Sequence, residues 1–176
     1  MQKNKCVFLD RDGVLNRERG DYTYKLEEFE VLPRVTEALA LLKENGYLLI
    51  VVTNQAGVAK GFYRRTDVLA CHQKLQESSD SIIDAIFYAP GHPSSSESLS
   101  RKPDSLMLER AIARYNIDPE ASWMVGDSLR DLQAAAKVGV AAVLVGEQHP
   151  AQTHPWQVQD LWEAAQLILQ NAKKPA

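Results

Sequence analysis

The sequence predicts an α/β fold, a three-layer sandwich in which helices cover both faces of a mainly parallel sheet. The first observation is that apolar runs typical of strands alternate along the chain with amphipathic segments typical of helices. The second is that the strand runs are almost continuously apolar, as expected when both faces of a sheet are buried. Such sheets bind ligands beyond the carboxyl ends of their strands, so the residues that follow each strand are the first candidates for a site.

Five short apolar runs are expected to form the strands of this sheet. Each run is bounded by polar or turn-forming residues and is too short for a helix. The expected strands are residues 6–10, 47–53, 85–88, 123–126 and 141–145. Because helical segments separate them, neighbouring strands are expected to pair in parallel.

The expected helices repeat apolar residues with a period close to that of an α-helix. In the first, Val35, Leu39 and Leu42 fall on one face, and Gly46 lies just past its end. The expected helices are residues 34–44, 66–78, 105–115, 130–138 and 158–171. Residues 16–31 and 89–104 do not fit the alternation, and we expect them to be long loops near the site.

Composition narrows the class of protein. With 176 residues, of which 45% are hydrophobic and 24% charged, the chain is expected to form a single globular domain over residues 1–176. No apolar run approaches the roughly 20 residues that span a bilayer, and no secretory signal is visible, so we expect a cytoplasmic protein without a membrane partner. The net charge of −3 argues against nucleic acid as a partner. Both cysteines, Cys6 and Cys71, are expected to be free.

The first candidate site residues are Asp10 and Asp12, at the end of the first expected strand. Residues two apart in an extended chain point to the same side, so both carboxylates are expected to project together while Arg11 points the other way. Gly13 permits a sharp turn directly afterwards. Two crowded carboxylates are costly unless a cation or a proton holds them, so the pair predicts a metal site or an acid/base pair.

Three further motifs follow in order along the chain. Thr53 ends the second expected strand, Lys102 precedes a proline in the second long loop, and Asp127 follows the fourth strand. The order DxD, Thr, Lys and GDxxxD resembles the haloacid dehalogenase-like phosphatase superfamily. The resemblance implies a Rossmann-like fold. Members often insert a cap domain between these motifs, but neither gap here has room for one, so we expect a capless chain.

The resemblance also implies a role for each motif. Asp10 would be the nucleophile that forms an aspartyl-phosphate, and Asp12 the general acid and base. Thr53 and Lys102 would stabilise the transferring phosphoryl group. The implied cofactor is Mg²⁺, held by the Asp10 side chain, the Asp12 backbone carbonyl and Asp127, since hard oxygen ligands suit this ion.

Asp131 has two readings that the sequence leaves open. It lies one helical turn beyond Asp127, from where it can reach the metal through water. As an acid in the first turn of a helix, it can equally stabilise the helix N-terminus.

Longer strings narrow the resemblance. LDRDGVLN, VVTNQAGVAKG, RKP and VGDSLRDLQAA resemble the subgroup of D-glycero-D-manno-heptose 1,7-bisphosphate 7-phosphatases and histidinol-phosphate phosphatases. The bisphosphatase reading fits better, because Arg101 precedes Lys102 as in the heptose enzymes, and it implies a place in lipopolysaccharide core synthesis. We expect a monomer with a small sugar-phosphate substrate. The alternatives are a phosphatase of histidinol phosphate or of polynucleotide 3′-phosphate, and an inactive phosphate-binding regulatory domain.

The subgroup also implies a set of substrate-binding residues on the loops around the motifs. They are Glu18, Arg19, Gly20, Asp21, Asn54, Gln55, Ala56, Arg101 and Ser128. Lys60, Arg64 and Arg65 are further cations nearby, and we expect the last two to be solvated.

The second long loop departs from the subgroup. Many relatives bind zinc there through a Cys-x-His and a Cys-x-Cys motif. The matching positions of this chain are Ala89, Gly91, Ser98 and Ser100, none of which supplies such a ligand. We therefore expect no zinc.

Overall fold

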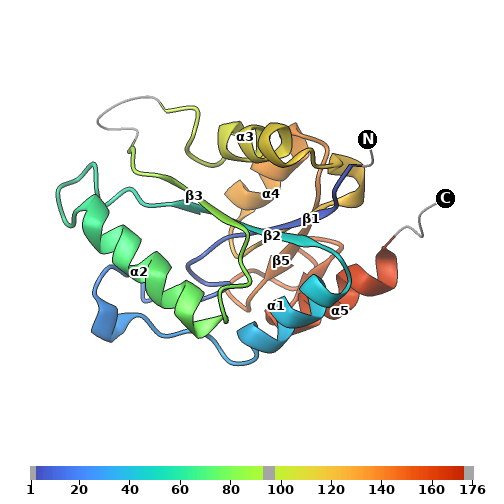
Figure 1. Cartoon of the computed structure of the whole chain (residues 1–176), viewed down its shortest axis with the longest axis horizontal. Coiled ribbons are helices and arrows are strands. Elements are labelled where there is room, and N and C mark those ends of the chain that lie inside the picture. Colours follow the sequence, from blue (N-terminus) through green and yellow to red (C-terminus); the bar gives the residue numbers. More distant parts are fainter. Residues whose placement is uncertain (1–2, 93–97, 173–176) are drawn as a thin grey trace.

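The computed structural model describes residues 3–92 and 98–172, and in them six parallel strands form one sheet (Figure 1). The strand order is β3-β2-β1-β4-β5-β6. The strands are β1 Cys6–Leu9, β2 Leu48–Asn54, β3 Ala85–Ala89, β4 Trp123–Gly126, β5 Ala141–Val145 and β6 Gln157–Val158. The central strands β1 and β4 are buried along their whole length, which explains their apolar composition.

Helices cover both faces of the sheet, as Figure 1 shows. Buried apolar residues of α1 Val35–Glu44, α2 Arg65–Ser78 and α5 Leu161–Asn171 contribute to one cluster. Those of α3 Leu106–Tyr115 and α4 Leu129–Lys137 belong to a second cluster. Each cluster also holds the strand residues that face it. The predicted three-layer α/β sandwich with a parallel sheet is therefore confirmed.

The strand order places a ligand site at the end of β1. From β1 the chain passes first to β2 on one side and later to β4 on the other, so β1 is the point at which the connections change direction. Leu9 pairs with Val51 of β2 and with Val125 of β4. Residues that follow these three strands therefore meet at one edge of the sheet, where open α/β sheets form their binding crevice.

The end of the chain departs from expectation. The sequence predicts a helix over residues 158–171. In the structure, Val158 belongs to β6 and pairs with Val145 of β5, and α5 begins only at Leu161. The Asp160 side chain accepts a hydrogen bond of 2.9 Å from the backbone N–H of Glu163, which caps the helix there. A two-residue strand is too short to show a period of its own. The other predicted elements exist, with ends shifted by one residue at most.

The two expected long loops are present in the described part of the chain. The first contains a 3-10 helix at Leu26–Glu28 and contacts α2, because the Leu26 carbonyl accepts a 2.7 Å hydrogen bond from Lys74. The second joins β3 to α3, and residues 93–97 of it lie outside the described residues. In the described residues, α2 is the only regular element between β2 and β3, as expected for a capless chain.

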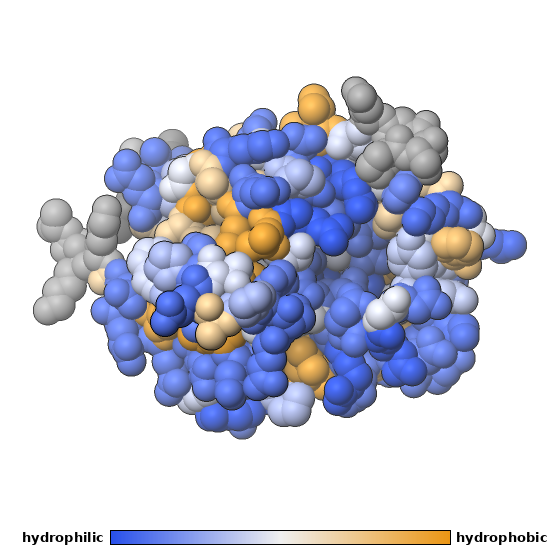
Figure 2. Space-filling model, turned by 180° about the vertical axis from the view of Figure 1, so that it is seen from behind, coloured by the Kyte–Doolittle hydropathy of each residue, from blue (hydrophilic) through white to orange (hydrophobic). Residues whose placement is uncertain are grey.

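The surface of the described residues is largely polar. The face in Figure 2 is mainly hydrophilic and is interrupted by small apolar patches. Cys6 and Cys71 are buried free thiols, as predicted. Within the described residues, no helix combines the length and the apolar character that crossing a membrane requires.

Candidate active site

A cleft of about 660 Å³ opens at the carboxyl edge of the sheet. Asp10 enters it from the end of β1, Asn54 from the end of β2, and Asp127 directly after β4. The Asp10 backbone N–H donates a 3.0 Å hydrogen bond to the Val125 carbonyl, so β1 is tied to β4 one residue beyond its end. The motifs predicted from strand ends are therefore neighbours in space.

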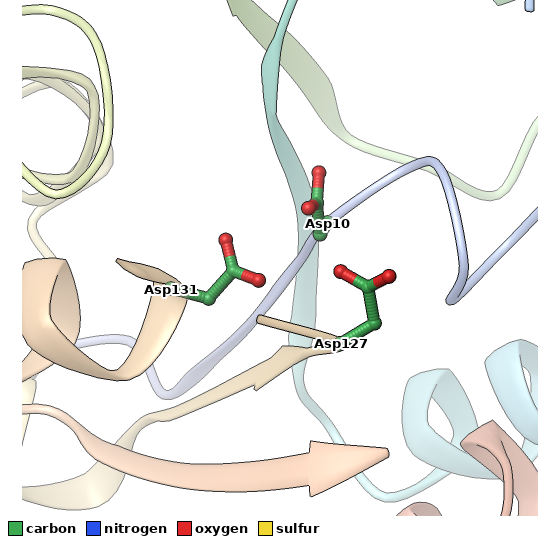
Figure 3. A group of neighbouring side chains, drawn as sticks. All are labelled: Asp10, Asp127 and Asp131. Carbon is green, nitrogen blue, oxygen red and sulfur yellow. The ribbon is translucent and has the colours of Figure 1, made fainter. Parts of the chain in front are cut away.

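Asp10 and Asp127, which line the cleft, lie close to the buried carboxylate of Asp131. Asp10, Asp127 and Asp131 each offer one oxygen atom, and these atoms lie within 4.8 Å of one another. Figure 3 shows the three side chains directed toward a common space, with Asp131 in the first turn of α4. Gly13 makes this approach possible, because a Cβ at that position would overlap the Asp127 carboxylate, and its φ of 81° suits glycine.

Burial, together with the neighbouring acids, raises the proton affinity of Asp10 and Asp127. Burial is the main cause that raises the pKa of Asp10 to about 8; Lys102 opposes it, and Asp131, Asp127 and Asp12 add to it. Burial likewise raises the pKa of Asp127 to about 6, with Asp131 adding to the effect and Lys102 opposing it. One lysine does not balance this set of acids. The carboxylate oxygens are the ligands that Mg²⁺ prefers, so the donor set fits this ion.

Lys102 lies beneath the acids with its side chain 1% exposed. Its Nζ is 3.0 Å from Asp10, 2.6 Å from Asp131 and donates a 2.8 Å hydrogen bond to the Val52 carbonyl. Burial opposes its charge, but Asp10 and Asp131 outweigh burial and raise the pKa of Lys102. All three ammonium protons therefore have an acceptor, which fixes the charge beside the predicted nucleophile.

Asp131 is fully buried and has a structural partner on each side. One oxygen accepts a 3.0 Å hydrogen bond from the Ser128 backbone N–H at the start of α4, and the other pairs with Lys102. Asp131 therefore caps the start of α4, which is one of the two roles that the sequence left open. The same carboxylate also belongs to the acidic cluster, so the two readings are compatible.

Arg11 does not point away from Asp12, as the strand alternation predicted. Its Nη2 donates to both carboxylate oxygens of Asp12, at 2.9 and 3.1 Å, and its side chain is buried. Asn16 donates a further 2.9 Å hydrogen bond to the same carboxylate. The prediction failed because β1 ends at Leu9, so residues 10–12 belong to a turn in which alternation no longer holds.

Thr53 and Lys102 lie below the cleft rather than along its wall. Thr53 is buried, and its Oγ1 accepts a 3.1 Å hydrogen bond from Gln55. The Asn54 side chain donates to the Lys102 carbonyl at 3.1 Å and accepts from the Lys102 N–H at 3.0 Å. Asn54 therefore holds the backbone of the lysine loop, a role beyond the predicted substrate contact.

Most of the predicted substrate-binding residues line the cleft. Those that do are Glu18, Gly20, Asp21, Asn54, Gln55, Ala56, Arg101 and Ser128. Arg19 is exposed and is not among the lining residues, which departs from its predicted place. Lys60 lines the cleft, whereas Arg64 and Arg65 are exposed away from it, as expected.

Sequence reasoning missed several lining residues. They are Tyr22, Thr23, Tyr63, His92, Arg130, Gln148 and His149. Gln148 and His149 follow β5 and contact the Asp127 carbonyl at 2.8 and 2.9 Å. Their position after a strand was a usable signal, because the loops after every parallel strand gather at the same edge. Tyr63 follows no strand, and nothing in the pattern indicated it.

The four positions aligned with a zinc site carry other contacts. Ala89 is buried at the end of β3, and Gly91 packs against Ser98. The hydroxyl oxygens of Ser98 and Ser100 are 2.7 Å apart and share a hydrogen bond. Direct packing and a hydroxyl pair therefore occupy these positions, which hold no cysteine or histidine.

Similarity to known proteins agrees with this geometry. The model of the haloacid dehalogenase-like hydrolase family matches residues 4–139, and the chain belongs to that family. More particularly, it is 39% identical over 145 residues to D-glycero-beta-D-manno-heptose-1,7-bisphosphate 7-phosphatase of Haemophilus ducreyi, covering 77% of this chain and 79% of that protein. The D-glycero-alpha-D-manno-heptose-1,7-bisphosphate 7-phosphatase of Burkholderia mallei is 37% identical over 152 residues, covering 81% and 80%.

A solved structure shows the same likeness in three dimensions. The D,D-heptose 1,7-bisphosphate phosphatase from B. bronchiseptica, crystallised with magnesium and phosphate, superposes with a TM-score of 0.84 at 34% identity. The superposition covers 96% of this chain and 99% of that protein. A HAD-like phosphatase from Mesorhizobium loti gives a TM-score of 0.85 at 27% identity, covering 99% and 90%.

Proposed function

We propose that this protein is a Mg²⁺-dependent phosphatase that removes the C7 phosphate from D-glycero-D-manno-heptose 1,7-bisphosphate. The observation that carries the proposal is the convergence of Asp10, Asp12, Lys102 and Asp127 at one edge of the sheet. The likeness to heptose bisphosphatases over most of the chain supports the choice of substrate. It also supports a role in building the heptose-containing core of lipopolysaccharide.

The residues that would hold Mg²⁺ are Asp10 and Asp127 through their carboxylates and Asp12 through its backbone carbonyl. When bound, the ion supplies the positive charge that lets an anionic phosphate approach a carboxylate. The raised proton affinity of Asp10 and Asp127 supports this assignment, because burial and the neighbouring acids disfavour their negative charge, and a bound cation would offset that cost as a proton does.

In the first half-reaction, a carboxylate oxygen of Asp10 attacks the phosphorus of the C7 phosphate. The P–O bond to the sugar breaks, and Asp12 gives its proton to the departing C7 oxygen. Lys102 balances the charge that gathers on the phosphoryl oxygens and on Asp10, from which its Nζ is 3.0 Å away. The products of this step are the sugar monophosphate and an aspartyl-phosphate on Asp10.

In the second half-reaction, Asp12 is a carboxylate and accepts a proton from a water molecule. The water oxygen attacks the phosphorus, and the bond between phosphorus and the Asp10 oxygen breaks. Inorganic phosphate leaves, Asp10 returns as a carboxylate, and Asp12 again carries the proton that the next cycle requires.

A cationic wall of the cleft supports a bisphosphate as substrate. Arg101, Lys60 and Arg130 line it together. Burial is the main cause that lowers the pKa of Arg101, and the neighbouring charge of Arg130 adds to it. Two guanidinium groups that repel each other in a cleft are stabilised by an anion between them, which the non-reacting phosphate supplies.

A substrate panel tests the proposal. The kcat/KM values for both anomers of the heptose bisphosphate, histidinol phosphate and fructose 1,6-bisphosphate should be compared in Mg²⁺. The heptose bisphosphate should be the best substrate, and Asp10→Asn should remove turnover of all of them while leaving the circular dichroism spectrum unchanged. A preference for histidinol phosphate would overturn the substrate, and substantial activity in Asp10→Asn would overturn the nucleophile.

We further propose that residues 1–176 act as one domain, as a monomer in the cytoplasm and without zinc. One six-stranded sheet, with an apolar cluster on each face, runs through the described residues, which supports a single domain. Gel filtration with light scattering and elemental analysis test these points. An active dimer, or one tightly bound zinc per chain, would contradict them.

A further inference from the structure

The side-chain amide of Gln55 joins three parts of the site. Its Nε2 donates to the Asp12 carboxylate oxygen Oδ2 and to the Thr53 hydroxyl, both at 3.1 Å. Its Oε1 accepts a 2.9 Å hydrogen bond from the Tyr63 hydroxyl. Gln55 is only 2% exposed, so its amide is committed to these partners rather than open to a ligand.

The amide of Gln55 has a defined orientation. Its NH₂ group faces Asp12 and its carbonyl oxygen faces Tyr63. An amide oxygen only accepts hydrogen bonds, so Tyr63 must be the donor. Burial is the main cause that raises the pKa of Tyr63 to about 12, so the phenol keeps the proton that it donates.

Tyr63 is itself held in place by packing. Its ring stacks on Tyr24, with 4.9 Å between centroids and 12° between planes, and meets the edge of Tyr22 at 5.7 Å. Gly57 lies against the same ring, where a Cβ would overlap Tyr63. The Tyr63 hydroxyl is therefore held in a fixed position, where it donates to the carbonyl oxygen of Gln55. Without Tyr63 the buried amide would lack this donor.

Gln55 also holds the Asp12 oxygen Oδ2, which Asn16 does not contact. Arg11 and Asn16 both donate to Oδ1, whereas Oδ2 receives Arg11 and Gln55. Arg11 and Asn16 belong to the same turn as Asp12, while Gln55 follows β2. Gln55 thus ties the turn that carries the acid to the strand that carries Thr53.

We propose that Tyr63 is a positioning residue that acts through Gln55 to hold the Asp12 carboxyl group in the orientation from which it protonates the leaving oxygen. The proposal rests on the role of Asp12 in the proposed function. It removes Gln55 from the residues that recognise the sugar and places it, with Tyr63, behind the general acid.

The kinetic test compares two leaving groups. Tyr63→Phe removes the donor but keeps the ring and its stacking. On a sugar or glycerol phosphate, whose alkoxide needs a proton, kcat should fall about three- to tenfold, the size expected for one neutral hydrogen bond. On p-nitrophenyl phosphate, whose leaving group needs little help, kcat should change less than about twofold, and KM should stay the same on both substrates. Tyr24→Phe is the matched control, because it alters a hydroxyl beside the same stack, and it should leave both kcat values unchanged.

A double-mutant cycle identifies the route. If Tyr63 acts through Gln55, Tyr63→Phe should have no further effect in a Gln55→Ala background. An equal loss on both substrates, a rise in KM alone, or full additivity with Gln55→Ala would overturn the proposal, since each indicates a general structural role or direct substrate contact.

A measurement that does not depend on turnover separates this proposal from the proposed function. In crystals of the Tyr63→Phe variant, Asp12 should occupy more than one side-chain orientation, while Arg11 keeps its place. A single unchanged Asp12 orientation would overturn the positioning role even if the enzyme proves to prefer another phosphate ester. Conversely, Asp12 could be disordered in the Tyr63→Phe crystals while the wild-type enzyme fails to hydrolyse heptose bisphosphate. That result would overturn the proposed substrate and leave the positioning role of Tyr63 supported.

Discussion

The carboxylate of Asp12 receives hydrogen bonds from nitrogen atoms of Arg11, Asn16 and Gln55. Arg11 and Asn16 belong to the same turn as Asp12, whereas Gln55 follows β2, so these donors hold the carboxyl group from two sides. The proposed role of Asp12 depends on this orientation, because a general acid must face the oxygen to which it gives its proton.

Substitution of Asp12 should therefore separate substrates by leaving group. Asp12→Asn should reduce kcat on a sugar phosphate by about 10²–10⁴-fold, the usual contribution of general acid-base catalysis, and much less on p-nitrophenyl phosphate. Steady-state kinetics on both esters measures the difference. Equal losses would count against Asp12 as the acid.

Arg101 offers a second prediction at the level of one side chain. If its guanidinium binds the non-reacting phosphate, Arg101→Ala should lower kcat/KM for the bisphosphate about tenfold to a hundredfold, as for a hydrogen bond between charged groups. A monophosphate of similar size should be little affected, because it has no phosphate at that end. Arg101→Lys should recover only part of the loss, since lysine lacks the forked geometry. A uniform loss would instead place Arg101 on the transferring phosphate.

At the scale of elements, the sheet and its helices follow from periodicity, while loop details do not. Asp10, Thr53 and Asp127 could be found from the sequence because each lies where an apolar strand ends. The direction of Arg11 could not, because it depends on where β1 stops pairing. Tyr63 reaches the site through the packing of its ring on Tyr24 and Tyr22, tertiary contacts that leave no local pattern in the sequence.

The start of α5 provides a test of an element boundary. Asp160→Ala removes the side chain that caps the helix, and should lower the free energy of unfolding by about 0.5–2 kcal/mol. Urea denaturation measures the change, and kcat should stay the same because Asp160 does not line the cleft. Glu147→Ala, an exposed acid outside any helix, is the control and should leave stability unchanged. An equally stable Asp160→Ala protein would contradict the capping role.

At the scale of the whole molecule, burying the charged group of Asp10 lowers the free energy of unfolding at neutral and alkaline pH. The metal-free fold holds Asp10 with a pKa of about 8, above the value of about 4 for an unfolded chain. Between those values the folded protein binds more protons than the unfolded chain. Its stability must therefore fall as pH rises through this range.

Metal-free protein should accordingly be less stable at pH 8 than at pH 6.5. This window lies above the range in which His72, with its pKa lowered to about 4 mainly by burial, has the opposite effect. Urea midpoints in EDTA measure the difference, and Asp10→Asn should flatten it. Added Mg²⁺ should raise the midpoint most at pH 8, because it binds the ionised folded form. A midpoint that is independent of pH in EDTA would contradict the crowding at Asp10.

The hydroxyl pair of Ser98 and Ser100 lies a few residues before Arg101, on the loop that carries it to the cleft. Serine hydroxyls are not oxidised by peroxide and need no metal. Zinc-bound thiolates, in contrast, are open to oxidation and depend on the supply of zinc. The two cysteines of this chain are buried elsewhere. We therefore expect the activity proposed for this chain to persist under oxidative stress and under zinc starvation. Exposure of the purified enzyme to hydrogen peroxide or to a zinc-selective chelator should leave its activity intact, and inactivation by either would show a hidden dependence.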